Sequence, residues 1–122
     1  MDERGAGLLK NTIEQAFTEK LRSLLIFGAN SRRYKDIFDM YYLGKTADKR
    51  KLGEAIDLLI FTDQNMREKD YEAIIKRVGS TFADKKYLER VSVSRQRWMD
   101  EPIEIITGGI LDRLEQLNNL ET

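Results

Sequence analysis

The residues best suited to chemistry lie close together at positions 33–39, which read RYKDIFD. Asp36 and Asp39 are three residues apart, so a helix would place their carboxylates side by side on one face. Lys35 can offset their repulsion by pairing with Asp39, and Arg32 by pairing with Asp36, because each pair is four residues apart. Lys and Arg bind phosphate oxygens, whereas Asp accepts a proton or holds a metal. The pattern predicts either one wall of a phosphate- or metal-bearing cleft or a solvated helix with surface ion pairs.

Lys20 is a second candidate, in a stretch with the apolar spacing of a helix. It falls at the edge of the apolar face, where a lysine can bury its stem and keep its ammonium group in water. A short connection follows, so we expect this helix and the charged one to be antiparallel neighbours. Lys20 lies about two turns before Gly28 and Asp36 about two turns after Ser31, at roughly 1.5 Å per residue. Their similar depth predicts either a Lys20–Asp36 salt bridge or a polar site that opens to solvent.

The composition narrows the possible chemistry. The chain has 122 residues, with 21 Lys plus Arg, 21 Asp plus Glu, no Cys and no His. There is therefore no disulfide, no zinc site built on thiolates or imidazoles, and no catalysis with a histidine base. The formal net charge of zero argues against a strong global attraction to nucleic acid. The charged opening MDER is unlike a secretory signal, and no apolar run approaches the ~20 residues of a membrane helix, so we expect a cytoplasmic protein.

The hydrophobic spacing predicts an all-α fold, a bundle of about six helices. We expect residues 1–11 to form a flexible lead-in or linker and residues 12–122 to form the helical domain. Gly28 and Gly44 should end the first two helices, because glycine adopts the left-handed conformation at a helix end without strain. Gly108 and Gly109 can bend the last helix. The expected helices cover residues 12–27, 33–43, 48–61, 68–82 and 84–98, followed by a last one that starts near Pro102.

The first two helices carry the most distinct faces. In the first, residues with helical spacing should form a buried stripe: Ile13, Ala16, Phe17, Leu21, Leu24 and Leu25. In the second, an aromatic face lies opposite the charged strip and is formed by Ile37, Phe38, Tyr41 and Tyr42.

Two segments together resemble the AbiEii/AbiGii family of nucleotidyltransferase toxins. Residues 12–25 read TIEQAFTEKLRSLL and contain the E-K-L stretch of that family. After a short loop, residues 31–42 read SRRYKDIFDMYY. The order and the gap of the two segments agree with the family, and the resemblance covers Thr12 to Leu43, about a quarter of the chain. The family's motif R-x-K-D-x-x-D is matched in full by Arg33, Lys35, Asp36 and Asp39.

The resemblance implies a polymerase-β type of nucleotidyltransferase fold in an N-terminal half, followed by a helical C-terminal half. Such enzymes use Mg²⁺ to transfer a nucleotide from an NTP to an acceptor, in some members the 3′ end of tRNA. They pair with an antitoxin in toxin–antitoxin and abortive-infection systems. Carried over by position, Lys20 would bind the triphosphate and Asp36 would be the essential catalytic carboxylate. Arg33, Lys35 and Asp39 would bind the substrate by shaping the same wall of the cleft.

One part of the family pattern is missing from this sequence. It has no strand with a Gly-Ser loop followed by an Asp-x-Asp pair, which is where the family holds its metal. We therefore expect the chain to be the C-terminal helical part of such a toxin, supplying one wall of the active site and inactive alone. We expect no metal on this chain. Its partners would be the N-terminal nucleotidyltransferase half, a cognate antitoxin and tRNA, with no membrane.

Two other functions stay open. A helical adaptor, or an antitoxin-like binding module without catalysis, would dock another protein through its aromatic face. An exposed aromatic patch on the second or the last helix would favour that function. A helical nucleic-acid-binding domain would instead bring Arg32, Arg33 and the basic cluster Lys45–Lys51 onto one face.

Overall fold

The computed structural model describes residues 12–95 and 101–121, and every regular element within them is helical. The predicted all-α fold is therefore confirmed. A 3-10 turn, η1 (Gly28–Asn30), and a π-helical turn, η2 (Asp57–Phe61), supplement the α-helices. In chain order these are α2 (Ile13–Phe27), α3 (Tyr34–Thr46), α4 (Lys49–Ile56), α5 (Tyr71–Phe82), α6 (Lys85–Arg95) and α7 (Ile103–Glu121).

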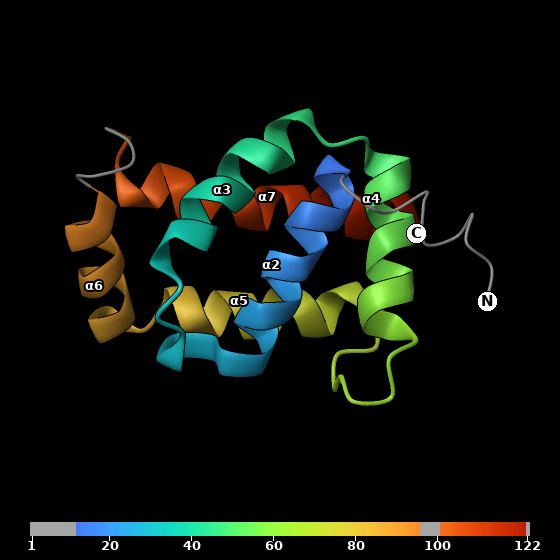
Figure 1. Ribbon diagram of the computed structural model, residues 1–122, viewed down its shortest axis with the longest axis horizontal. Coiled ribbons are helices and arrows are strands. Elements are labelled where there is room, and N and C mark those ends of the chain that lie inside the picture. The colour runs from blue at the N-terminus through green and yellow to red at the C-terminus, as the bar shows by residue number, and fades with distance from the viewer. Residues whose placement is uncertain (1–11, 96–100, 122) are drawn as a thin grey trace.

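The helices pack around one apolar core. Helix α2 packs against α3 and α4, and α7 packs against α3 and α5. Helices α4 and α6 stand at opposite ends of the molecule with α2 between them (Figure 1). Of the helices in the described ranges, none is long and apolar enough to cross a membrane. Among the largest fully buried side chains are Phe17, Leu21, Ile37, Phe38, Met40, Leu52, Ile56, Ile74, Tyr87, Ile106 and Ile110.

Several helix ends differ from the sequence-based expectation. Helix α3 continues through Gly44 to Thr46, so the expected end at Gly44 is wrong. Gly44 serves packing instead, because a Cβ there would lie 3.3 Å from Cε2 of Phe17, and the missing side chain lets the two helices approach. Helix α5 begins at Tyr71, not at residue 68, because the Asp70 carboxylate accepts the amide of Ala73 and caps it. Helix α7 is continuous through Gly108 and Gly109.

Two residues of the expected apolar faces lie at the surface. Ile13 is 41% exposed and Tyr42 is 48% exposed, whereas the other residues of these faces are buried or half-buried. The predicted lead-in at residues 1–11 and the expected helix end at Trp98 lie outside the described residues.

Candidate functional site

The candidate site lies where α2 and α3 run beside each other. Thr12 caps α2, since its hydroxyl accepts the amide of Gln15 at 2.9 Å. Helix α2 ends at Gly28, whose φ of 56° is a conformation that glycine adopts without the strain of a Cβ. The Ser31 amide then donates to the Gly28 carbonyl at 3.0 Å, so the chain turns back within a few residues. Lys20 on α2 and Asp36 on α3 thereby come to face each other.

Two arginines from later in the chain hold this turn in place. Nε of Arg77 on α5 donates to the carbonyl of Leu25 at 3.2 Å. Nη2 of Arg90 on α6 donates to the carbonyl of Ala29 at 2.7 Å. The Arg77 guanidinium lies so close to Gly28 that a Cβ there would be 2.6 Å from Nη2. The relative position of α2 and α3 thus depends on α5 and α6 as well as on the turn.

Lys20 lies at the centre of the cluster of ion pairs and bridges two carboxylates of α3. Its Nζ is 3.1 Å from Oδ1 of Asp36 and 3.4 Å from Oδ2 of Asp39. The two carboxylates are one helical turn apart and would repel each other, and the ammonium group between them removes that repulsion. The predicted Lys20–Asp36 salt bridge is therefore present in the structure.

Two more cations from α3 and its N-terminal end complete the cluster. Nε of Arg33 is 2.9 Å from Oδ2 of Asp36, so both oxygens of this carboxylate are paired. Nζ of Lys35 is 3.5 Å from Oδ2 of Asp39, which is the expected pair four residues apart. The pair expected between Arg32 and Asp36 is wrong, because Arg33 takes that place and Arg32 is exposed. We call Lys20, Arg33, Lys35, Asp36 and Asp39 the ionic cluster.

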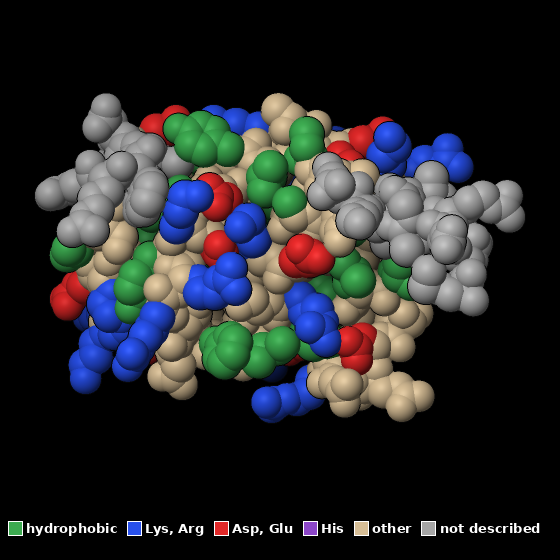
Figure 2. Space-filling model, in the orientation of Figure 1, with side chains coloured by type: hydrophobic (Ala, Val, Ile, Leu, Met, Phe, Trp, Pro, Cys, Tyr) green, Lys and Arg blue, Asp and Glu red, His purple; other side chains and the backbone are tan. Residues whose placement is uncertain are grey.

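The ionic cluster is partly exposed to solvent. The Asp36 and Lys20 side chains are 12% and 22% exposed, whereas those of Arg33 and Lys35 are 67% and 57% exposed. A shallow depression of about 180 Å³ opens beside Lys20, Arg33 and Asp36. Figure 2 shows basic and acidic side chains interspersed in the middle of the viewed face, where Figure 1 places α2 and α3. The cluster is therefore accessible, and Asp36 and Lys20 are its most buried side chains.

Aromatic rings from α5 and α6 pack near the beginning of α3. The ring of Tyr34 lies 6.2 Å from that of Tyr87 on α6, and Phe82 stacks on Tyr87 at 6.4 Å. The Tyr87 hydroxyl is buried and has no hydrogen-bond partner in the part of the chain that the structure describes. Burial raises the pKa of Tyr87, and the nearby Tyr34 and Asp36 add to the increase while Arg90 opposes it. Tyr87 therefore stays neutral and acts as a packing residue.

The donor set of the ionic cluster suits an anion better than a metal ion. Within residues 12–95 and 101–121, no group of three or more acidic side chains could hold a metal. Asp36 and Asp39 are already paired with ammonium and guanidinium groups, so a metal ion would have to displace those cations. The three cations exceed the two carboxylates by one, and the two most exposed side chains, Arg33 and Lys35, are both cationic. These groups can bind phosphate oxygens.

Three positioning residues could not be identified from the sequence. Glu14 is buried, and its Oε2 accepts the backbone amide of Asp48 at 2.8 Å, which fixes the start of α4 against α2. A glutamate three residues before a predicted core phenylalanine gives no sign of this contact, because its partner lies 34 residues away. The same holds for Arg77 and Arg90, whose partners are backbone carbonyls on distant elements.

The structure bears on the two alternative functions. The aromatic face of α3 is turned mainly into the protein, since Phe38 and Tyr41 are buried and Tyr42 alone among the aromatic residues of that face is exposed. Helix α7 carries no aromatic residue. Arg33 and Lys45 lie near opposite ends of α3, about 18 Å apart along the helix axis. Among the described residues of these two helices no exposed aromatic patch is formed, and the basic residues Arg33 and Lys45 do not share one compact site.

Comparison with known proteins identifies no relative of this chain. No family model, no curated protein and no solved structure matches this chain.

Proposed function

We propose that this chain is the helical portion of a nucleotidyltransferase of the AbiEii/AbiGii type and that its ionic cluster forms the phosphate-facing wall of the NTP site. The observation that carries the proposal is the meeting of Lys20 with Arg33, Lys35, Asp36 and Asp39 in one accessible cluster. These are the residues that the resemblance selects, and two separate helices bring them together.

The contribution of these ion pairs to folding stability is too small to explain why the ionic cluster is present. Exposed ion pairs contribute about 0–1 kcal/mol each, and well-packed apolar residues often replace buried pairs at no loss. A lysine between two carboxylates is, however, a group that can exchange one anion for another. Lys20 and Arg33 can turn towards a triphosphate, while their ion pairs with Asp36 and Asp39 hold the two cationic side chains in position.

The proposed reaction is the transfer of a nucleoside monophosphate. The oxygen of an acceptor hydroxyl, such as a tRNA 3′ end, attacks the α-phosphorus of the NTP. The bond between the α-phosphorus and the bridging oxygen breaks, pyrophosphate leaves, and the hydroxyl proton passes to a base or to water. The metal-holding carboxylates belong to a separate nucleotidyltransferase half in this proposal, because Asp36 and Asp39 are paired with cations. A cognate antitoxin would be the regulatory partner.

A binding experiment on the chain itself tests the phosphate-facing wall. ATP titrated into the ¹⁵N-labelled chain should shift the amide signals around Lys20 and Arg33, and adenosine should not, because the proposed contacts are to phosphate. Lys20→Ala should weaken ATP binding at least tenfold. Lys86→Ala is the matched control, since Lys86 is an exposed lysine of α6, and it should bind ATP as the unchanged chain does. ATP shifts that are absent, or that Lys20→Ala leaves unchanged, would rule out this wall.

An activity experiment tests the rest of the proposal. The chain alone, incubated with labelled NTPs, Mg²⁺ and tRNA, should incorporate no label. A protein that contains a nucleotidyltransferase half and this chain should lose transfer and toxicity on Lys20→Ala or Asp36→Ala, with the helical circular dichroism spectrum unchanged. Robust incorporation by the chain alone, or full toxicity of both variants, would contradict the proposal.

A further inference from the structure

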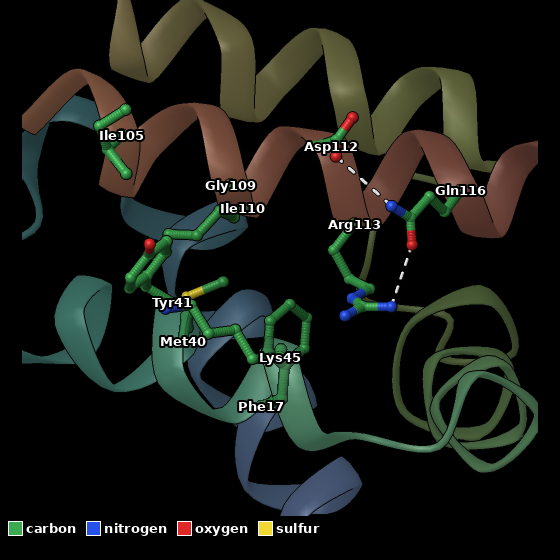
Figure 3. Close-up of a pocket in the computed structure, with 11 residues that line it drawn as sticks. Phe17, Met40, Tyr41, Lys45, Ile105, Gly109, Ile110, Asp112, Arg113 and Gln116 are labelled. Atoms are coloured by element: carbon green, nitrogen blue, oxygen red, sulfur yellow. Dashed lines mark hydrogen bonds between the residues drawn. The ribbon is translucent and has the colours of Figure 1, made fainter.

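A second hollow lies on a different part of the molecule, between α3 and α7. Its volume is about 250 Å³, which is more than the roughly 150 Å³ of an apolar cavity that holds benzene. Phe17 on α2 and Met40 and Tyr41 on α3 form one side, and Ile110 on α7 forms the other. Figure 3 shows these side chains around the hollow, with Arg113 reaching from α7 towards the side that carries Phe17.

Two glycines bring the walls of this hollow together. A Cβ on Gly109 would lie 2.6 Å from Cε1 of Tyr41, and a Cβ on Gly44 would lie 3.3 Å from Cε2 of Phe17. Larger residues would therefore force the helices apart or fill the space. The Tyr41 hydroxyl donates to Oε2 of Glu101, which fixes the ring at the edge of the hollow. The apolar surface is thus held by the packing of the helices.

Arg113 gives the hollow a cationic group with unused donors. Its Nη1 donates to Oε1 of Gln116 at 3.0 Å, and no carboxylate lies within 4.0 Å of it in the described part of the chain. Asp112 also lines the hollow, and its Oδ2 accepts a hydrogen bond from Nε2 of Gln116 at 3.4 Å, so this carboxylate is paired with the amide and not with the arginine. A guanidinium group has five N–H donors, and its fork matches a carboxylate in two parallel hydrogen bonds.

Lys45 adds a second positive charge at the rim. Its Nζ lies 4.2 Å from the centre of the Tyr41 ring and 4.0 Å from Oε1 of Glu101. The cation–π contact keeps the ammonium group beside the hollow, and its side chain remains half exposed. An anion in the hollow would therefore meet Arg113 directly and be attracted by Lys45 from the rim.

We propose that this hollow binds a small monocarboxylate with a flat apolar body. The carboxylate pairs with the Arg113 fork, and the body packs on Phe17, Tyr41 and Ile110. A ring with one carboxylate fits the volume, since about 150 Å³ suffices for the ring alone. A single guanidinium group neutralises the one charge of a carboxylate, whereas a phosphate monoester carries a charge of about −1.5 to −2 at neutral pH and would need a second direct cation.

The proposed site is separate from the ionic cluster. Asp36 and Lys45 are nine residues apart on α3, which is about 13 Å along the helix axis. Failure of nucleotide binding at Lys20 would therefore leave this proposal intact. Failure of carboxylate binding at Arg113 would likewise leave the proposed nucleotide site intact.

Benzoate is the probe for the experiment, with benzamide as its neutral counterpart and phenyl phosphate as the phosphate arm. Titration of benzoate into the ¹⁵N-labelled chain should give saturable shifts at Lys45, Gly109 and Gln116. Benzamide should bind at least tenfold more weakly, because it lacks the charge. Binding of benzamide as tight as that of benzoate, or of phenyl phosphate alone, would overturn the assignment to carboxylates.

Two variants and a control separate the site from a general charge effect. Arg113→Gln should abolish the benzoate shifts, and Lys45→Gln should weaken binding by a few fold while leaving the fold intact, because Lys45 is exposed. Arg67→Gln removes an exposed arginine of the loop between η2 and α5 and should bind benzoate like the unchanged chain. If Arg113→Gln fails to fold, Lys45→Gln still tests the proposal, because unchanged benzoate binding in that variant would contradict it. Shifts spread over the whole surface would overturn it as well.

Discussion

The two halves of α3 contact their neighbours in different ways. The polar face of the first half meets α2 through ion pairs, in which Lys20 lies between Asp36 and Asp39. The second half meets α7 through close packing, in which the Tyr41 ring occupies the space that a Cβ on Gly109 would need. The first contact tolerates exchange of one charged partner for another. The second tolerates almost no change of shape.

This difference determines which residues of α3 affect ligand binding and which affect the free energy of unfolding. Partly exposed charges contribute little to the free energy of unfolding, so they are available for a ligand. A tightly packed helix crossing contributes more, because overpacking or a void is costly. We therefore expect substitutions in the second half to change stability most and substitutions in the ionic cluster to change binding most.

The largest effect on stability should come from Gly109→Ala. Its Cβ would overlap the Tyr41 ring, whereas nothing lies within 4 Å of a Cβ on Gly108. Both changes gain similar helix propensity, so the difference between the two variants isolates the overlap. Urea unfolding should show Gly109→Ala to be less stable than Gly108→Ala by about 1–3 kcal/mol. Equal stabilities would mean that the ring of Tyr41 moves aside freely and that the α3–α7 contact is not rigid.

The sequence was sufficient to predict the elements but only part of their contacts. Helical spacing and the charged motif depend on residues within a turn or two of each other, so α2 and α3 follow from local patterns. The Lys20–Asp36 pair spans 16 residues, and it could be predicted because the short connection makes the two helices neighbours. Gly44 does not end α3 as the sequence predicts, because its close contact is with Phe17, 27 residues earlier, and the local pattern gives no sign of it. The hollow at Arg113 was missed for the same reason, since its walls come from three helices.

A smaller effect should come from breaking the ionic cluster. A double-mutant cycle of Lys20→Ala and Asp36→Ala should give a coupling of about 0.2–1 kcal/mol in urea unfolding, because both side chains are partly exposed. The coupling should fall in 1 M NaCl, where the screening length is about 3 Å. The Gly108–Gly109 difference should not change with salt in this way. A coupling of several kcal/mol would show that the cluster is mainly structural and would weaken the case for a binding role.

The smallest effect should appear at alkaline pH, in the second half of α3. The Tyr41 side chain beside it raises the pKa of Lys45 above its ordinary 10.5, and the charge of Glu101 adds to the increase. A group whose pKa is raised in the folded protein stabilises it fully below the unfolded pKa and loses that contribution as the pH rises through the folded value. The stability difference between the unchanged chain and Lys45→Gln should therefore be constant up to about pH 10 and shrink above it. Urea unfolding across this range measures the difference, with Lys86→Gln as the control for an exposed lysine. A difference that does not shrink above pH 10 would mean that the ammonium group gains nothing from Tyr41, and the second half of α3 would then depend on shape alone.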